Sequence, residues 1–169
     1  DTNGWIDKVN YAEGLFLQEY LGKEEAGHFV FISGGEIRSL VTNQEFKRAF
    51  TGDMGPLAGA PLAGIVEQDP QDKYGLAEQL IHPLKPWFKQ TKYTGPLQVT
   101  AIRKNGVWNA IEYNIRLGVT TTALLLRMLK NPLKVLLDVV QNKTPVLDWY
   151  PKRKYGCTLT LAGYGYPYI

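Results

Sequence analysis

Three polar residues alternate along one predicted strand near the middle of the chain. Between positions 111 and 118, strand geometry places Glu112, Asn114 and Arg116 on one face. Successive side chains on that face lie about 7 Å apart. Carboxylate and amide oxygens are Mg²⁺ ligands and a guanidinium binds phosphate oxygens, so the three suit a metal held beside a phosphate. The same alternation is typical of a solvated sheet face, and on the residues alone both interpretations stay open.

A second candidate lies at the start of a segment rich in glycine and proline. Lys47 and Arg48 come just before residues 51–64, where glycines free backbone amides that can cradle an anion such as phosphate. A charged loop edge is the alternative. Glu24 and Glu25 lie where a carboxylate can accept hydrogen bonds from ribose hydroxyls.

The remaining reactive side chains are predicted to be structural. His28 lies in an apolar strand and His82 in a proline-interrupted helix, and neither has a nucleophile or ligand partner nearby in the sequence. Cys157 is predicted to be an inert thiol buried in a strand. The sequence contains no P-loop, no dinucleotide fingerprint and no nucleophile elbow, so those reaction classes lose their simplest support.

Hydrophobic periodicity predicts the elements that must position these residues. We expect an α+β domain, an antiparallel sheet with helices packed on it. The Asn105-Gly106 pair indicates a type I′ hairpin turn, and prolines should bend or break the first helix. The expected strands are 15–20, 28–32, 36–41, 97–102, 107–117 and 155–161, the expected helices are 71–89, 120–129 and 132–140, and 51–64 is expected to be a long loop.

Composition narrows the class of protein. The 169 residues, 44% of them hydrophobic, suffice for one domain with an ordinary core. A net charge of +3 is too small to indicate nucleic acid or an anionic membrane as the main partner. One cysteine and two histidines exclude a disulfide framework and a Cys/His zinc cage, which favours the reducing cytoplasm.

Several of these segments, taken in order, resemble motifs of the phosphoribosylamine–glycine ligase family of the ATP-grasp superfamily. The matching segments are FLQEYLGKEEA (16–26), QEFKR (44–48), TGDMGP (51–56), YTGPL (93–97), IEYNIRLG (111–118) and the end of the chain from Leu161 to Pro167. The resemblance implies a ligase that uses ATP to form glycyl phosphate, which the amine of phosphoribosylamine attacks. ADP and phosphate are released.

The resemblance also implies a role for each matching residue. The metal ligands, for Mg²⁺ or Mn²⁺, would be Glu112 and Asn114. Glu19 would lie near the adenine of ATP and Glu25 on its ribose. The catalytic cations would be Arg116, Lys47 and Arg48.

The match is partial, and two motifs depart from the family. By this resemblance, residues 1–145 correspond to the carboxyl-side portion of an ATP-grasp domain and residues 146–169 to the start of a carboxy-terminal domain. The other ATP-grasp subdomain is therefore an expected partner. Without it, the isolated piece should be inactive. Where the family has Asn-Thr-Gly-Gly-Met-Gly, this chain has the different segment Leu57–Leu62. Where the family has Asp-Pro-Glu, this chain has Val119–Thr121. Either the acceptor differs from phosphoribosylamine, or the domain is a non-catalytic module that binds nucleotide or protein. A third hypothesis is a nucleic-acid binder using Arg103, Lys104 and residues 152–154.

Overall fold

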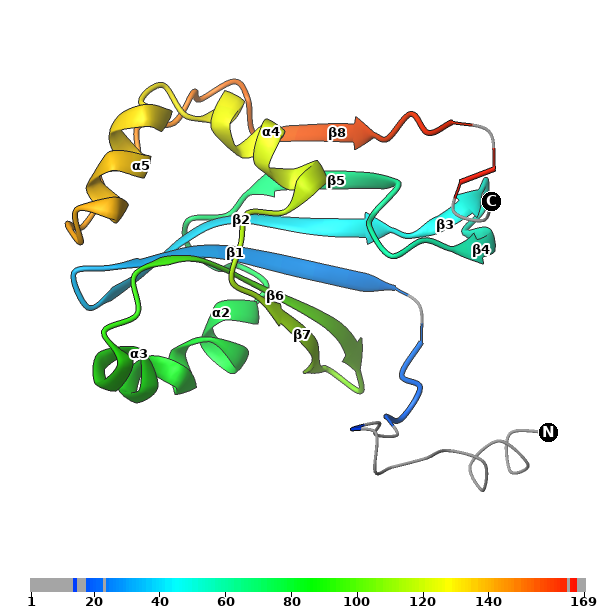
Figure 1. The fold of residues 1–169 in the computed structure, drawn as a ribbon, viewed down its shortest axis with the longest axis horizontal. Helices are drawn as coiled ribbons and strands as arrows, with labels where there is room; N and C mark the ends of the chain where they lie inside the picture. The colour runs from blue at the N-terminus through cyan, green and yellow to red at the C-terminus, as the bar shows by residue number, and fades with distance from the viewer. Residues whose placement is uncertain (1–13, 15–17, 23, 164, 167–169) are drawn as a thin grey trace.

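The chain forms one six-stranded antiparallel sheet with helices on both faces (Figure 1). The computed structural model describes residues 14, 18–22, 24–163 and 165–166. The strands are β1 (Glu25–Ser33), β2 (Glu36–Phe46), β3 (Arg48–Phe50), β4 (Met54–Leu57), β5 (Ala63–Gln68), β6 (Gly95–Lys104), β7 (Val107–Asn114) and β8 (Tyr155–Leu159). The helices are α2 (Leu76–Leu80), the 3₁₀ turn η2 (His82–Leu84), α3 (Lys85–Thr91), α4 (Val119–Met128) and α5 (Pro132–Val140).

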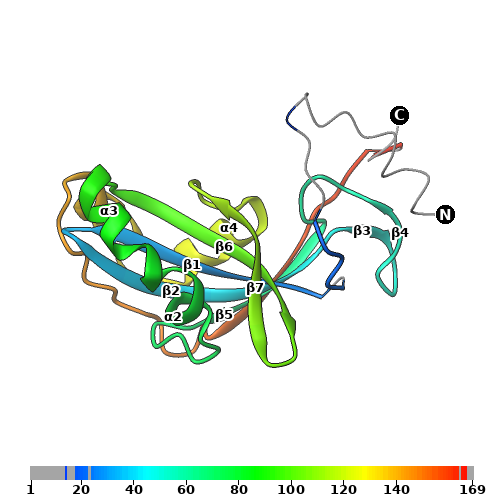
Figure 2. The same cartoon turned by 90° about the horizontal axis from the view of Figure 1, so that it is seen from below.

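Each face of the sheet carries its own core. The strand order is β7-β6-β1-β2-β5-β8, and β3 and β4 form a separate hairpin beyond the end of the sheet that lies far from α3 and α5 (Figures 1 and 2). In β1, Phe29 and Phe31 pack under α4 and α5, while Val30 and Ile32 pack against α2 and α3. We call these two sides the α4 face and the α2 face. Because β1 is buried on both sides, its sequence is a continuous apolar run rather than an alternating one.

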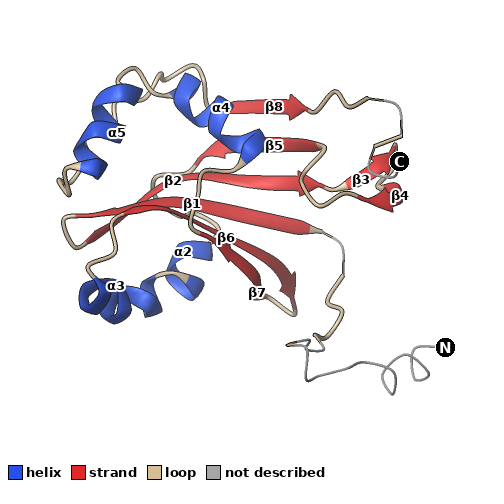
Figure 3. Ribbon diagram, in the orientation of Figure 1, coloured by secondary structure: helices blue, strands red, loops and turns tan. Residues whose placement is uncertain are grey.

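The predicted fold class is confirmed, with local differences. Strands 28–32, 36–41 and 97–102, the hairpin turn and helices 120–129 and 132–140 form as expected (Figure 3). The strand predicted at 15–20 does not form at residues 18–20, and its residues 15–17 lie outside the described residues. Pro167, the end of the last family-like motif, also lies outside them. The predicted strand 107–117 ends at Asn114. The predicted domain division at residue 145 stays a prediction, although β8, beyond it, is an edge strand of the same sheet.

Two expected stretches are interrupted by local backbone geometry. The loop predicted at 51–64 was wrong, because Gly52 and Asp53, both at positive φ, make a turn that lets β4 pair with β3. The helix predicted at 71–89 is three short segments, α2, η2 and α3. Its start is delayed to Leu76 by left-handed Asp72 and Gly75, and Pro83 separates α2 from α3.

Cys157 is exposed, which corrects the prediction of a buried thiol. The residue lies in β8 at the edge of the sheet, and its partner across the β5–β8 ladder, Ile65, is itself half exposed. A strand pattern cannot distinguish an edge strand from a central one.

The β6–β7 turn gives a first testable prediction. Asn105 and Gly106 both have positive φ, of 52° and 81°, as a type I′ turn requires. A Cβ at Gly106 would meet open space, so a Gly106→Ala change has only the backbone cost. We expect it to lower the free energy of unfolding by about 1 kcal/mol in urea titrations. The matched control is Gly59→Ala, also in open space but without a positive φ, which should change stability by less than about 0.5 kcal/mol.

In the described part of the chain, no helix combines the length and the apolar character needed to cross a membrane.

Candidate functional site

One cavity on the α4 face gathers most of the predicted site residues. It lies where the end of β7 meets the start of α4. Its polar lining includes Glu45, Lys47, Gln98, Glu112, Asn114 and Arg116, and its remaining wall is formed by residues 59–61 and 118–120. The Nδ2 of Asn114 donates a hydrogen bond to Oε1 of Glu112 at 3.1 Å, which leaves the amide oxygen of Asn114 available to a ligand.

A β-bulge is what turns Glu112 toward this cavity. Glu112 pairs with Thr100, but Ala110 pairs with the next residue, Ala101, so Ile111 is an extra residue in β7. Before the bulge, Trp108 and Ala110 pack on the α2 face. Strict alternation would have put Glu112 on that same side. The bulge reverses the alternation and sends Glu112 and Asn114 to the α4 face instead.

Lys47 is surrounded by three carboxylates. Its Nζ lies 2.5 Å from Oε2 of Glu25, 3.8 Å from Oε2 of Glu45 and 4.0 Å from Oε1 of Glu112. Burial alone would lower the pKa of Lys47, but the hydrogen bond to Glu25 and the three negative charges outweigh burial and raise it. Glu45 and Glu112 line the cavity together with Lys47 and Arg116, so two carboxylates stand beside two cations, and the oxygen ligands for a divalent cation are those of Glu112 and Asn114.

Glu45 is a site residue that the sequence interpretation missed. Only 8% of it is exposed, and its Oε1 accepts hydrogen bonds from Nδ2 of Asn43 at 3.0 Å and Nε2 of Gln98 at 2.8 Å. Burying a charged carboxylate costs free energy, so a buried glutamate held by two amides is typical of a site where the charge has a function. The available signal was the alternation of Asn43, Glu45 and Lys47 along one strand, the same pattern that identified Glu112.

This buried network depends on a glycine. Gln98 in β6 reaches Glu45 in β2 across β1 at Gly27, where an added Cβ would lie 2.5 Å from Oδ1 of Asn43 and 2.7 Å from Nε2 of Gln98. We therefore expect Gly27→Ala to displace both amides and lower the free energy of unfolding by about 1–3 kcal/mol in urea titrations. The same change at Gly59, where a Cβ meets nothing and φ, as at Gly27, is not positive, controls for the added methyl group alone. A loss at Gly27 no larger than at Gly59 would contradict the crossing described here.

The first turn of α4 adds anion-binding potential to the cavity wall. Gly118 is the N-cap and has extended backbone geometry, and no side chain caps the helix. Val119 and Thr120 line the cavity, so the unpaired amides of this turn lie beside it. With Arg116 at the same wall, this end of the cavity suits phosphate oxygens.

The other predicted residues lie at increasing distance from this cavity. Glu25 does not line this cavity and is connected to it only by its ion pair with Lys47. Arg48 lines an adjoining hollow of about 100 Å³ with Glu25 and Lys47, and its Nη1 donates to the carbonyl of Gly55 at 2.8 Å. Glu19 pairs with Nζ of Lys104 at 2.5 Å and, among the described residues, lines neither hollow.

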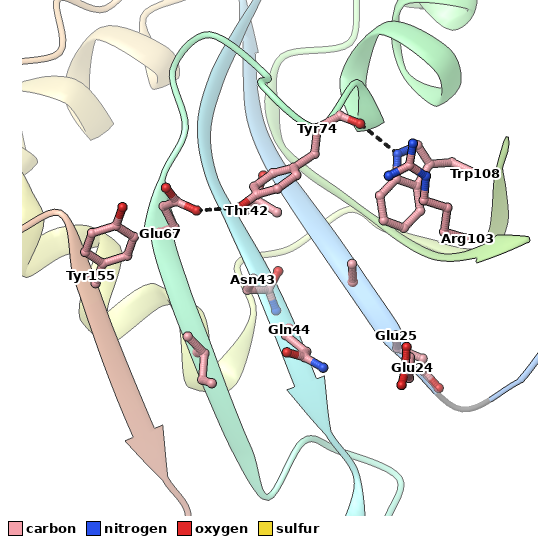
Figure 4. Close-up of a pocket in the computed structure, with 12 residues that line it drawn as sticks. Glu24, Glu25, Thr42, Asn43, Gln44, Glu67, Tyr74, Arg103, Trp108 and Tyr155 are labelled. Atoms are coloured by element: carbon pink, nitrogen blue, oxygen red, sulfur yellow. Dashed lines mark hydrogen bonds between the residues drawn. The ribbon is translucent and has the colours of Figure 1, made fainter. Parts of the chain in front are cut away.

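A larger hollow of about 470 Å³ lies on the opposite, α2 face (Figure 4). Tyr74, Trp108 and Tyr155 form its aromatic lining, and Glu24 lies at its rim. The indole Nε1 of Trp108 donates to the carbonyl of Tyr74 at 2.8 Å, and Arg103 stacks on the Trp108 ring. Because the sheet separates this hollow from Glu112 and Asn114, the two sites are distinct.

Comparison with known proteins supports the family resemblance that the motifs indicated. Phosphoribosylamine–glycine ligase from Halalkalibacterium halodurans is 31% identical over 155 residues, which cover 89% of this chain. The enzyme of the same name from Lactococcus lactis is 30% identical over 163 residues, covering 90%. This chain is homologous to a segment of phosphoribosylamine–glycine ligase. No family model matches it. The match covers 36% and 38% of these two relatives, so the chain spans just over a third of their length.

Solved structures agree on the fold. Phosphoribosylamine–glycine ligase from Thermotoga maritima superimposes with a TM-score of 0.69 at 23% identity, covering 89% of this chain and 39% of that one. The phosphoribosylaminoimidazole carboxylase ATPase subunit from Aquifex aeolicus gives 0.58 at 15% identity, covering 89% of this chain and 44% of that one. The antiparallel sheet and its helices therefore have the ATP-grasp fold, as the motifs predicted.

Proposed function

We propose that this chain forms one wall of the active site of an ATP-dependent carbon–nitrogen ligase related to phosphoribosylamine–glycine ligase. The observation that carries the proposal is the single cavity in which Glu112, Asn114, Arg116 and Lys47 meet. These residues belong to two motifs that lie more than sixty positions apart in the sequence. A solvated sheet face would not bring them together beside a helix N-terminus and a buried glutamate.

The proposed substrates follow from the names of the relatives. A carboxylate oxygen, from glycine or a similar acid, attacks the γ-phosphorus of ATP; the bond to ADP breaks and an acyl phosphate forms. The nitrogen of phosphoribosylamine or a similar amine then attacks the acyl carbon, phosphate leaves, and the nitrogen loses a proton. One cysteine in 169 residues is the ground for placing this activity in the cytoplasm.

The cavity has a volume of only about 30 Å³, so its residues would contact the metal and the phosphates of a nucleotide rather than enclose the whole molecule. A bound Mg²⁺ or Mn²⁺ would be held by Glu112 and Asn114 and would neutralise charge on the phosphates. Arg116 and the first amides of α4 would bind phosphate oxygens, and Lys47 would offset the charge of the carboxylates around it. Three further roles are proposed from the family motifs alone: Glu25 would contact the ribose, Glu19 would lie at the adenine, and Arg48 would be a catalytic cation.

The two departing segments bear on the acceptor. Gly59, Ala60 and Pro61 line the cavity where the family has a polar, glycine-rich loop, so this wall offers few hydrogen bonds to an acceptor. The family's two acids after Gly118 are replaced by Val119, which lines the same cavity, and by Thr121. These substitutions favour the second candidate function, a non-catalytic module that binds nucleotide without turning it over.

An exchange of segments separates the two functions. The chain replaces the homologous segment in the Halalkalibacterium halodurans enzyme, and ADP release and hydroxylamine trapping of acyl phosphate are measured with glycine and other small carboxylates. Carboxylate-dependent ADP release with trapped acyl phosphate is the result expected for a ligase. Binding of Mg²⁺–ATP without turnover would favour the module, and loss of both in a folded chimera would overturn the proposal.

A further inference from the structure

A buried group of polar side chains lies on the α2 face, away from the proposed nucleotide cavity. His28 in β1 and Thr42 in β2 meet Asp69 and Asp72, which lie in the loop between β5 and α2. The Nδ1 of His28 lies 3.8 Å from Oδ2 of Asp69 and 3.7 Å from Oδ1 of Asp72. The hydroxyl of Thr42 lies 2.8 Å from Nδ1 of His28 and donates to Oδ2 of Asp69 at 2.6 Å.

Both carboxylates are fixed by backbone amides. Asp69 accepts from the amide of Lys73 at 2.8 Å, and Asp72 accepts from the amides of Ala77 at 3.0 Å and Glu78 at 2.7 Å. Such outer hydrogen bonds hold ligand carboxylates in place at metal sites. The arrangement of the carboxylates is therefore set before any ligand binds.

The charges of this group are not balanced by a permanent cation. Asp69 and His28 are buried, and the Nε2 of His28 has no hydrogen-bond partner. Among the described residues, the ion pairs of Asp69 and Asp72 are with His28 alone. Two carboxylates facing one imidazole in a buried place are costly unless a cation joins them.

The distances fit a metal ion. One nitrogen and two carboxylate oxygens all lie within 4.8 Å of one another, and the two N–O distances are 3.8 and 3.7 Å, so a point equidistant from the three atoms lies at most about 2.4 Å from each, near the 2.0–2.2 Å of zinc ligands. The Thr42 hydroxyl offers a fourth oxygen. Imidazole nitrogen with carboxylate oxygens suits zinc and related transition metals. We propose that His28, Asp69 and Asp72 bind a divalent transition metal ion of the zinc class.

The site has a route to solvent and a structural consequence. Asp72 lines a hollow of about 660 Å³ beside α2, together with Pro70, Lys73 and Glu78. An ion entering from there would tie β1 to the loop that begins α2, two parts of the chain about forty residues apart. Its role would be structural, because the hollow on this side is separate from Glu112 and Asn114.

Zinc titration of the whole, metal-stripped chain tests the site. With excess Mg²⁺ present to occupy the cavity of Glu112 and Asn114, isothermal titration should show one saturable zinc site of micromolar affinity or tighter, which Asp69→Asn and Asp72→Asn each weaken at least about tenfold. Added Zn²⁺ should raise the Tm of the unmodified chain. It should raise the Tm of the Asp72→Asn variant only slightly or not at all. Co²⁺ should give the visible absorption of a site with a nitrogen ligand, lost in His28→Gln.

Two control variants make the outcome specific. His82→Gln removes the other histidine, which is exposed and pairs with Glu78, and should leave zinc affinity unchanged. Glu112→Gln, in the nucleotide cavity, should also leave it unchanged, so failure here and failure of the proposed function are distinguishable. The proposal is overturned if no saturable zinc binding occurs, or if binding survives the His28 and Asp69 changes in folded protein.

Discussion

Replacing Glu112 with glutamine is expected to weaken binding of Mg²⁺–ATP at least tenfold, about 1.4 kcal/mol in binding free energy. The substitution keeps the size of the side chain and removes one of the two carboxylate charges, those of Glu45 and Glu112, that line the cavity beside Lys47 and Arg116. It also replaces a hard oxygen ligand with a neutral amide, which binds divalent ions less strongly. Isothermal titration of the folded chain, or of the chimera, with Mg²⁺–ATP and Mn²⁺–ATP measures the change.

The matched control for this prediction is Glu36→Gln. Glu36 is exposed at the start of β2 and pairs with Lys85, far along the strand from the cavity. Its substitution removes the same charge from the whole molecule, so long-range effects of net charge are equal in the two variants. Equal nucleotide affinity in both would mean that Glu112 holds no metal, and the assignment of the cavity would fail.

Phe29→Ala is expected to produce the largest loss of stability, about 3–5 kcal/mol in the free energy of unfolding. Phe29 is fully buried in the α4-face core beside Val41, Val66 and Leu125. The end of its ring also packs against Gly118, where an added Cβ would lie 2.7 Å from Cζ of Phe29, so the ring supports the N-cap of α4. A domain of this size is stable by about 5–15 kcal/mol, and the loss should therefore be plain in urea unfolding.

Two measurements make this prediction specific. Ile115→Ala, at a side chain that is 70% exposed, should change stability by less than about 0.5 kcal/mol. Because Phe29 supports Gly118, the Phe29 variant should also lose nucleotide affinity under conditions where it is still folded. A loss of stability comparable to that of Ile115→Ala would show that the core is not packed around Phe29.

The sequence by itself determined most of the local elements and supplied the candidate site residues. Asn105-Gly106 defined the hairpin because few residue pairs accept two successive positive φ angles. Helix α5 was predicted from the proline at its first turn, where a missing amide costs no hydrogen bond. The residues of the motif that contains Glu112 and Asn114 suit a metal beside a phosphate, but alternation alone is also typical of a solvated sheet face, and the resemblance to the family favoured the metal site.

Only the tertiary structure decided which residues face each other across strands. The bulge at Ile111 sends Glu112 to the α4 face, and the pairing of β1 with β2 and β6 buries Glu45 among the amides of Asn43 and Gln98. The same pairing, with the loop before α2, brings His28 to Asp69, although the sequence shows no partner near either. Strand register, sheet edges and bulges depend on contacts between distant segments, and no local pattern encodes them.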